Sequence, residues 1–328
     1  MKLWWRAFSL VMLMAAPGGP ALGQGREPAP GPVPAGNNQS SGPIPELTGA
    51  WGHNFLLFEP PPTGPGPVVT KLRKRDGTGI FSAAGDYTNP ILKPQAAEVV
   101  KRNAERELGG APIPNPHNQC WPEPTPFTLN IQFGMRIIQR KNEVLLLYLS
   151  DHQVRRVRMN VPHAAHPPPT WQGESVGRYE GDTLVVDTIG QKIGPLSMID
   201  RFGTPFSAGM RVIERYRLID GALAQKLQLK HEHDYFLNGS PFRNAYGMGD
   251  IDPDARKPGL QVEITVDDPA VFTTPWSALA TYRHVTGEWP EAVCAENTHG
   301  SGTSPVKTST STCIFSSCSV PQAERSDF

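Results

Sequence analysis

The chain has 328 residues, enough for one large domain or two modest ones. Its 31 basic and 31 acidic residues give a formal net charge of zero, and they form no basic stripe, which disfavours a nucleic-acid partner. The 35 prolines and 32 glycines indicate many turns and extended segments, and they argue against a helical bundle.

Residues 1–23 have the three parts of a secretory signal peptide. Lys2 and Arg6 supply the positive start, residues 8–16 are apolar, and residues 21–23 (Ala-Leu-Gly) form a small-residue cleavage site. The apolar run is too short for a permanent anchor, although an uncleaved anchor is the alternative. We therefore expect a soluble periplasmic or secreted protein with no membrane span after cleavage.

The remaining chain divides by composition. Residues 24–45 are rich in Pro, Gly, Ser and Asn and predict a disordered leader. Residues 46–299 are expected to form a single β-rich domain, and residues 300–328 a flexible tail rich in Ser, Thr and Cys. Near the start of the domain, Gly49-Ala50-Trp51 resembles the first strand of lipocalin-type barrels, in which the Trp plugs the closed end.

The clearest helix is expected from about Lys93 to Leu108. Pro94 suits its first turn, and Gly109-Gly110 end it. Its few apolar side chains recur at roughly helical spacing, so that one face can pack on a sheet.

From residue 127 onward the pattern is typical of strands. Gly181-Asp182 predicts a tight turn between two of them, and alternation in Leu260–Val266 puts the apolar residues on one face. In the strand that ends at Met159, Arg155, Arg156 and Arg158 are expected to be exposed. The full set of expected strands is Phe127–Gln139, Val144–Leu149, Asp151–Met159, Ser175–Glu180, Thr183–Thr188, Met210–Ile219, Leu260–Val266 and Ser277–His284. Together they predict a mainly β protein, an antiparallel barrel or sandwich, with one or two short helices.

Residues 222–236 fit two structures. A strand would put His231 and His233 on one face, whereas an exposed helix would not. Periodicity alone does not decide between them.

Export would place the four cysteines in an oxidising compartment, where three pairings are open to them. We expect Cys120 to pair with Cys294, since both lie in well-patterned sequence, and Cys313 with Cys318 to close a small local loop. Free buried thiols are the alternative. No C-x-x-C is present, so the spacing predicts no zinc site.

Residues 170–188 read TWQGESVGRYEGDTLVVDT and resemble the TWxGxSxGRWEGDTLVVDT core of a family of uncharacterised exported bacterial proteins. Residues 151–157 resemble the family's HQVRRI strand, and Cys294–His299 resembles its CAENTH motif. The resemblance covers most of the chain from Leu47 to Val293. It implies a β-rich, lipocalin-like barrel, and it implies no particular activity. In the family, the counterpart of residues 222–236 is Ala/Glu-rich and helix-like.

Ser175 lies in a Gly-x-Ser-x-Gly sequence, which is typical of a hydrolase nucleophile only where a strand leads into a helix. Here a hairpin follows instead. His163 and His166 suggest metal ligands, but no further ligands are visible, so we expect neither a metal nor a cofactor. The full set of candidate catalytic residues is His163, His166, His231, His233, Glu214, Asp187 and Ser175.

Glu214 and Asp187 interrupt apolar strands. Alternation puts Glu214 on the apolar face, where an unpaired charge would be costly, so we expect an ion pair with an arginine. A structural role is favoured over catalysis for both carboxylates.

The aromatic residues Trp171, Tyr179, Tyr216 and Trp276 are candidates for ligand contact, with core packing as the alternative. The leading hypothesis is a protein that binds a small, mostly apolar or aromatic molecule in a β-barrel cavity. One alternative is a hydrolase, isomerase or lyase that uses His and carboxylate groups. Another is an envelope interaction protein without a pocket.

Overall fold

The computed structural model describes residues 44–53, 57–73, 83–131, 133–235, 251–286 and 293–294. The expected signal peptide, nearly all of the leader, the tail and the pair Cys313 and Cys318 lie outside these residues, so those expectations stay predictions. No helix within the described residues is long and apolar enough to cross a membrane.

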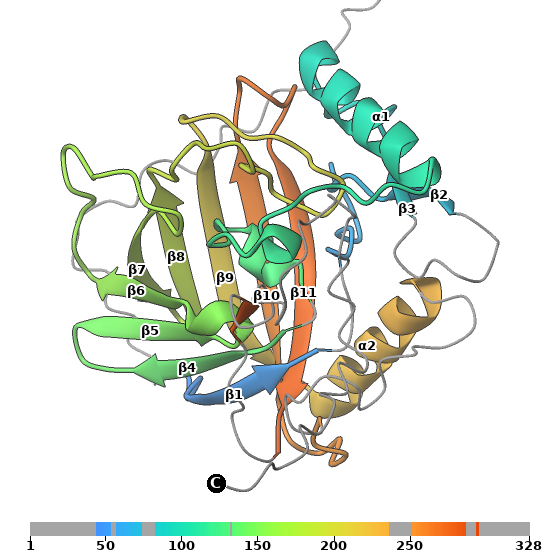
Figure 1. The fold of residues 1–328 in the computed structure, drawn as a ribbon. Coiled ribbons are helices and arrows are strands. Elements are labelled where there is room, and N and C mark those ends of the chain that lie inside the picture. Colours follow the sequence, from blue (N-terminus) through green and yellow to red (C-terminus); the bar gives the residue numbers. More distant parts are fainter. Residues whose placement is uncertain are drawn as a thin grey trace, which may run out of the picture. The chain divides into compact units, whose positions relative to one another are not determined.

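Nine strands of the described chain form a closed barrel (Figure 1). Two further strands, β2 (Thr70–Arg73) and β3 (Ala83–Gly85), pair with each other beside it. The predicted mainly β fold is confirmed in its barrel form. The barrel strands are β1 (Gly49–Gly52), β4 (Met135–Gln139), β5 (Glu143–Tyr148), β6 (Val154–Met159), β7 (Glu174–Glu180), β8 (Thr183–Ile189), β9 (Arg211–Ile219), β10 (Gly259–Asp267) and β11 (Trp276–His284).

Neighbouring barrel strands pair antiparallel, except β6 and β7, which are parallel. β7 and β8 form the predicted hairpin, with Gly181 at positive φ in the turn. β1 closes the barrel between β4 and β11, through Trp51 opposite His284 and Gly52 opposite Arg283. Closure leaves no free sheet edge along these pairings.

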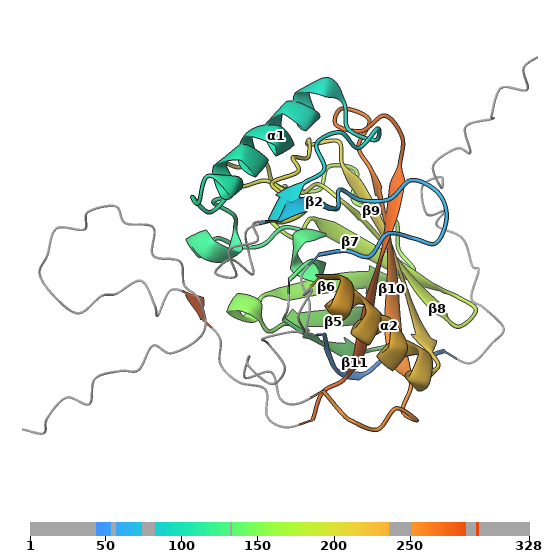
Figure 2. The ribbon, with the colours of Figure 1, turned by 90° about the vertical axis from the view of Figure 1, so that its right-hand side faces the viewer.

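The helix expected from Lys93 is α1 (Pro94–Leu108), which begins at the predicted proline. The ambiguous segment is a helix, α2 (Gly221–Tyr235), so the strand alternative for residues 222–236 is wrong. Figures 1 and 2 both show α2 alongside the outer face of β10 and β11. Ala224 packs directly over Gly259 of β10. The two residues are so close that any larger side chain at position 259 would meet the methyl group of Ala224.

The strand expected at Phe127–Gln139 is wrong in its first half. Phe127–Leu129 forms a short 3-10 helix, η2, and only Met135–Gln139 is a strand. Phe127, Leu129 and Ile131 are fully buried in the hydrophobic core. Their apolar character therefore reflects packing in the core and not the pleat of a sheet.

Inward-facing side chains fill the barrel. Trp51, Tyr216 and Tyr282 are each at most 1% exposed, and they belong to the same core as the apolar residues of β5, β8 and β10. The indole nitrogen of Trp51 donates to the carbonyl oxygen of Leu47 at 2.9 Å. Such close packing is the normal condition of a protein interior.

Candidate functional site

Strand β6 carries three arginines that point to opposite faces of the barrel wall. Arg156 and Arg158 point outward, but Arg155 is only 2% exposed, so the expectation that all three are exposed is wrong for Arg155. The reason is the two-residue period of a strand, which puts Arg155 on the same face as the buried Val157. A buried guanidinium must find partners inside the barrel.

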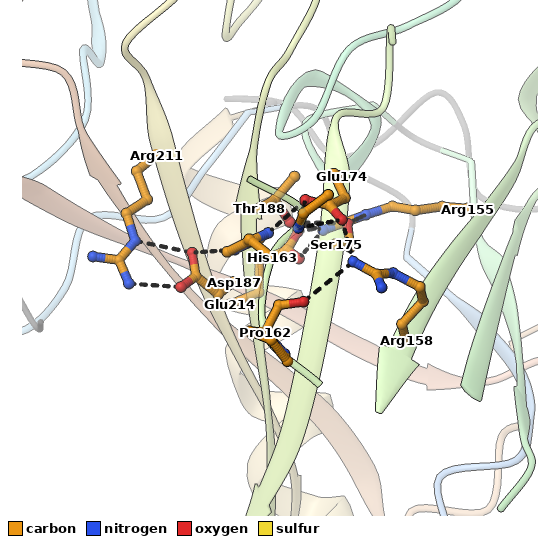
Figure 3. Close-up of polar contacts among 11 residues, drawn as sticks. Arg155, Arg158, Pro162, His163, Glu174, Ser175, Asp187, Thr188, Arg211 and Glu214 are labelled. Carbon is orange, nitrogen blue, oxygen red and sulfur yellow. Dashed lines mark hydrogen bonds and ion pairs between the residues drawn. The ribbon is translucent and has the colours of Figure 1, made fainter. Parts of the chain in front are cut away.

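Arg155 is the centre of an inner cluster with Ser175, Thr188 and Glu214 (Figure 3). Its Nη1 and Nη2 donate to the two carboxylate oxygens of Glu214 at 2.9 and 2.6 Å. Its Nε donates to Ser175 Oγ at 2.9 Å, and Nη2 also donates to Thr188 Oγ1 at 2.5 Å. Glu214 is thus the inward, arginine-paired carboxylate that strand alternation predicts.

Burial alone would lower the pKa of Arg155, but the adjacent Glu214 raises it well above its ordinary value. The guanidinium therefore stays charged inside the barrel. Two parallel charge-assisted hydrogen bonds are the strongest arrangement open to such a pair.

Ser175 is unsuited to act as a nucleophile. It lies within strand β7, is 2% exposed, and its hydroxyl is hydrogen-bonded to Arg155 and, at 3.0 Å, to Thr188. A nucleophile elbow instead exposes its hydroxyl on a sharp turn between a strand and a helix.

An outer cluster lies on the other face of the same wall and consists of Arg158, His163, Glu174, Asp187 and Arg211 (Figure 3). Glu174 pairs with Arg158 and lies 2.9 Å from His163 Nδ1. His163 Nε2 lies 3.6 Å from Asp187 Oδ1, and Arg211 holds the same carboxylate through two contacts of 2.9 and 2.6 Å.

The charges of the outer cluster favour a protonated His163. Burial lowers the pKa of His163, but Asp187 and Glu174 more than offset this, and the pKa lies above its ordinary value. Burial likewise raises the pKa of Asp187, yet Arg211 and His163 bring it below the usual range. Both ring nitrogens of His163 face carboxylates, so the imidazole is arranged to hold two anions and not to take a proton from a substrate.

The structure thus brings together four of the seven candidate catalytic residues, but on opposite faces of the wall. Ser175 and Glu214 face inward, whereas His163 and Asp187 face outward. Ser175 and His163 therefore do not form a nucleophile–base pair. His166 is exposed in the loop after His163, and the His233 side chain lies outside the described residues. Within the described part of the chain, no group of three His, Cys, Asp or Glu residues is placed to hold a metal ion.

The remaining candidate, His231, lines a pocket of about 410 Å³ between α2 and the outer face of β11. Its Nδ1 lies 3.4 Å from Glu59 Oε1, and both side chains are largely buried. The segment of Glu59 is held against β11 by two backbone hydrogen bonds with Leu279, of 3.0 and 2.8 Å. Most of the other lining residues are apolar, among them Leu57, Phe58, Val69, Leu227 and Leu279.

Sequence reasoning singled out His231 but missed the rest of this pocket. Its walls come from the segment at residues 57–70, from α2 and from β11. Their meeting depends on how α2 docks against the barrel, and no local pattern in the sequence signals that contact.

None of the four candidate ligand-binding aromatics lines the pocket at His231. Tyr216 and Trp276 are buried in the core. Tyr179 Oη receives a hydrogen bond from Gln139 Nε2 at 2.7 Å. Trp171 packs edge-to-face on Trp121, with 5.5 Å between ring centres. Tyr216 and Trp276 therefore pack in the core, which is the alternative that the sequence offered for these residues.

The expected disulfide between Cys120 and Cys294 is present. Fold and bridge together define a disulfide-bonded closed β-barrel with one helix docked on its outer wall. No family model, no curated protein and no solved structure matches the chain.

Proposed function

We propose that this protein binds one small, mostly apolar molecule in the pocket between α2 and β11. The pocket itself carries the proposal. Its volume of about 410 Å³ falls in the range of roughly 300–1,000 Å³ typical of small-molecule sites. Mostly apolar walls with a few polar side chains are likewise typical of such sites.

The sequence predicted a ligand inside the barrel. The close packing of the barrel interior favours the outer pocket as the binding site instead. The Arg155–Glu214 pair occupies the interior, among side chains that are almost entirely buried. A ligand there would have to displace packed residues, whereas the outer pocket needs no rearrangement.

The lining also suggests the form of the ligand. Leu57, Phe58 and Leu279 would contact an apolar body. The neighbouring His231 and Glu59 offer hydrogen bonding to a single polar group on it. If the protein were an enzyme, its acid–base chemistry would rest on His231 and Glu59, because Ser175 and His163 lie on opposite faces of the barrel wall.

The N-terminal pattern and the disulfide support the proposal that binding takes place outside the cytoplasm, in the periplasm or beyond. The resemblance to exported bacterial proteins and the Gly-x-Trp start of β1 support a lipocalin-like barrel as the scaffold.

Native mass spectrometry of protein purified from its source envelope should show an adduct of one small molecule. In parallel, the neutral fluorescent probe N-phenyl-1-naphthylamine should bind saturably, with one site per chain. Leu227→Trp would fill part of the pocket and should weaken probe binding at least about tenfold, a loss of roughly 1.4 kcal/mol.

Leu229→Trp is the matched control, because Leu229 lies on the same helix and is 48% exposed. It should leave probe affinity unchanged. Equal binding by the wild type and the Leu227→Trp variant, together with the absence of any adduct, would reject the pocket as the binding site.

A further inference from the structure

The junction of β6 and β7 differs from the other junctions of the barrel. It is parallel, and its register covers three residue pairs, from Val157 opposite Ser175 to Met159 opposite Gly177. The following junction, between β7 and β8, covers seven pairs. Parallel pairing is also slightly weaker per residue than antiparallel pairing. Among the described strands, the two junctions of β1 are as short or shorter, with three pairs to β4 and two to β11, but both are antiparallel. The β6–β7 junction is therefore a weak seam relative to the junctions on either side of it, which cover five and seven pairs.

The chain between these two strands, residues 160–173, runs back along the outside of the wall, as a parallel connection requires. Glu174 anchors this crossover loop. Its carboxylate accepts the Ala164 N–H at 3.1 Å and faces His163 Nδ1 at 2.9 Å. Near its start the loop is therefore held to the wall through the Glu174 carboxylate, and near its end through backbone hydrogen bonds of Thr170 with Gly190 and Lys192, of 3.2 and 2.8 Å.

Side chains on both faces reinforce the seam. Inside, Arg155 of β6 donates to Ser175 of β7, to Thr188 of β8 and to Glu214 of β9. Outside, Arg158 of β6 pairs with Glu174 of β7. The outer contacts also include a histidine, whose ordinary pKa lies near neutral pH.

His163 is the member of the outer cluster whose ordinary pKa lies closest to neutral pH. It faces Glu174 of β7 and Asp187 of β8, and these are paired with Arg158 of β6 and Arg211 of β9. When protonated, the ring carries a positive charge between two carboxylates, with Nδ1 at hydrogen-bonding distance from Glu174 and Nε2 3.6 Å from Asp187. When neutral, it has one donor, so one nitrogen lone pair faces a carboxylate and the loop loses a charge-assisted contact.

We propose that the barrel loosens at the β6–β7 seam, and that the protonation of His163 decides whether the crossover loop holds that seam closed. The proposal is independent of the ligand pocket on β11. The pKa of His163 lies above its ordinary value of 6.5, as Asp187 and Glu174 outweigh the effect of burial. The contact is therefore complete in mildly acidic solution and is lost as the pH rises through the raised pKa.

Hydrogen exchange of the full chain, read by mass spectrometry and corrected for intrinsic rates, tests this. Between about pH 5.5 and pH 8.5, protection of peptides that span residues 154–177 should fall roughly tenfold in the wild type, while β9 and β10 stay constant. His163→Gln should show, at both pH values, the low protection that the wild type shows at the higher pH. His163→Lys keeps the positive charge and should lose the pH dependence while retaining more protection than His163→Gln.

His166→Gln is the matched control, since His166 lies in the same loop and is exposed. It should follow the wild type at both pH values. Equal protection of the seam at both values in the wild type, or a pH dependence that survives in His163→Gln, would overturn the proposal.

Discussion

At the scale of single residues, Glu214 is the partner that allows a guanidinium to sit inside the barrel. Glu214→Gln would leave Arg155 charged, buried and without a counter-ion. Breaking a buried pair in this way costs roughly 3–5 kcal/mol of unfolding free energy. Urea denaturation of the variant should show that loss.

Two further variants separate the charge effect from other causes. Replacing both partners, Arg155→Met with Glu214→Leu, should recover much of the lost stability, because the buried charge is then gone. Arg156→Met removes a solvent-exposed pair with Glu143 and should leave the midpoint of urea unfolding close to that of the wild type. A Glu214→Gln variant as stable as the wild type would show that the pair contributes little.

The sequence allowed one half of this pair to be predicted. Glu214 lies between Val212 and Tyr216 at two-residue spacing, so its inward direction follows from alternation. Its partner did not follow, because Arg155, Arg156 and Arg158 form a polar run without a clear apolar face. Only the successive pairings of β6 with β7, β7 with β8 and β8 with β9 bring Arg155 to Glu214.

At the scale of elements, α2 is attached to the barrel through Gln228. Its Nε2 donates to the carbonyl oxygens of Gly52 in β1 and of Thr281 in β11, both at 3.1 Å. Gln228→Leu would leave these two acceptors buried and unpaired, at a cost of roughly 1–3 kcal/mol. We expect faster proteolysis of α2 and weaker binding of the naphthylamine probe, because Leu227 of the same helix lines the pocket.

Gln225→Leu makes the same chemical change three residues earlier on α2, at a partly exposed position. It should leave both the proteolysis rate and probe affinity close to those of the wild type. Equal effects of the two substitutions would mean that the hydrogen bonds of Gln228 do not hold the helix in place.

Elements with local signals were predicted well, and elements defined by distant contacts were not. α1 begins at its predicted proline, and the β7–β8 hairpin turns at its predicted glycine. The sequence does not decide between helix and strand for α2, because Leu223 and Leu229 are exposed and blur its apolar face. The strand predicted over η2 is wrong because its apolar residues pack in the core, and no short window of sequence reveals that burial.

At the scale of the whole molecule, the strand series predicted a barrel or a sandwich, and only the pairing of β1 with both β4 and β11 decides for the barrel. The candidate functional residues likewise divide into those that a local pattern predicts and those that depend on distant contacts. The inward direction of Glu214 is a local property, whereas the pocket at His231 requires three segments far apart in the chain to meet.

The bridge between Cys120 and Cys294 acts at this largest scale, because it joins residues 174 positions apart. Its C-terminal end is also fixed by a hydrogen bond of 2.6 Å from the Cys294 N–H to Asp151 Oδ1. Cross-linking so long a loop restricts the unfolded chain, and removing such a bridge typically costs about 2–5 kcal/mol. Cys120→Ser with Cys294→Ser should therefore lower the midpoint of urea unfolding.

Reductant separates this bridge from the two cysteines of the tail. Dithiothreitol should lower the wild-type midpoint to that of the double variant, and it should have little further effect on the double variant itself. Should the double variant unfold at the wild-type midpoint, the bridge would contribute no stability. Should reductant destabilise the double variant strongly, a second bridge between Cys313 and Cys318 would carry stability of its own, although it closes a much shorter loop.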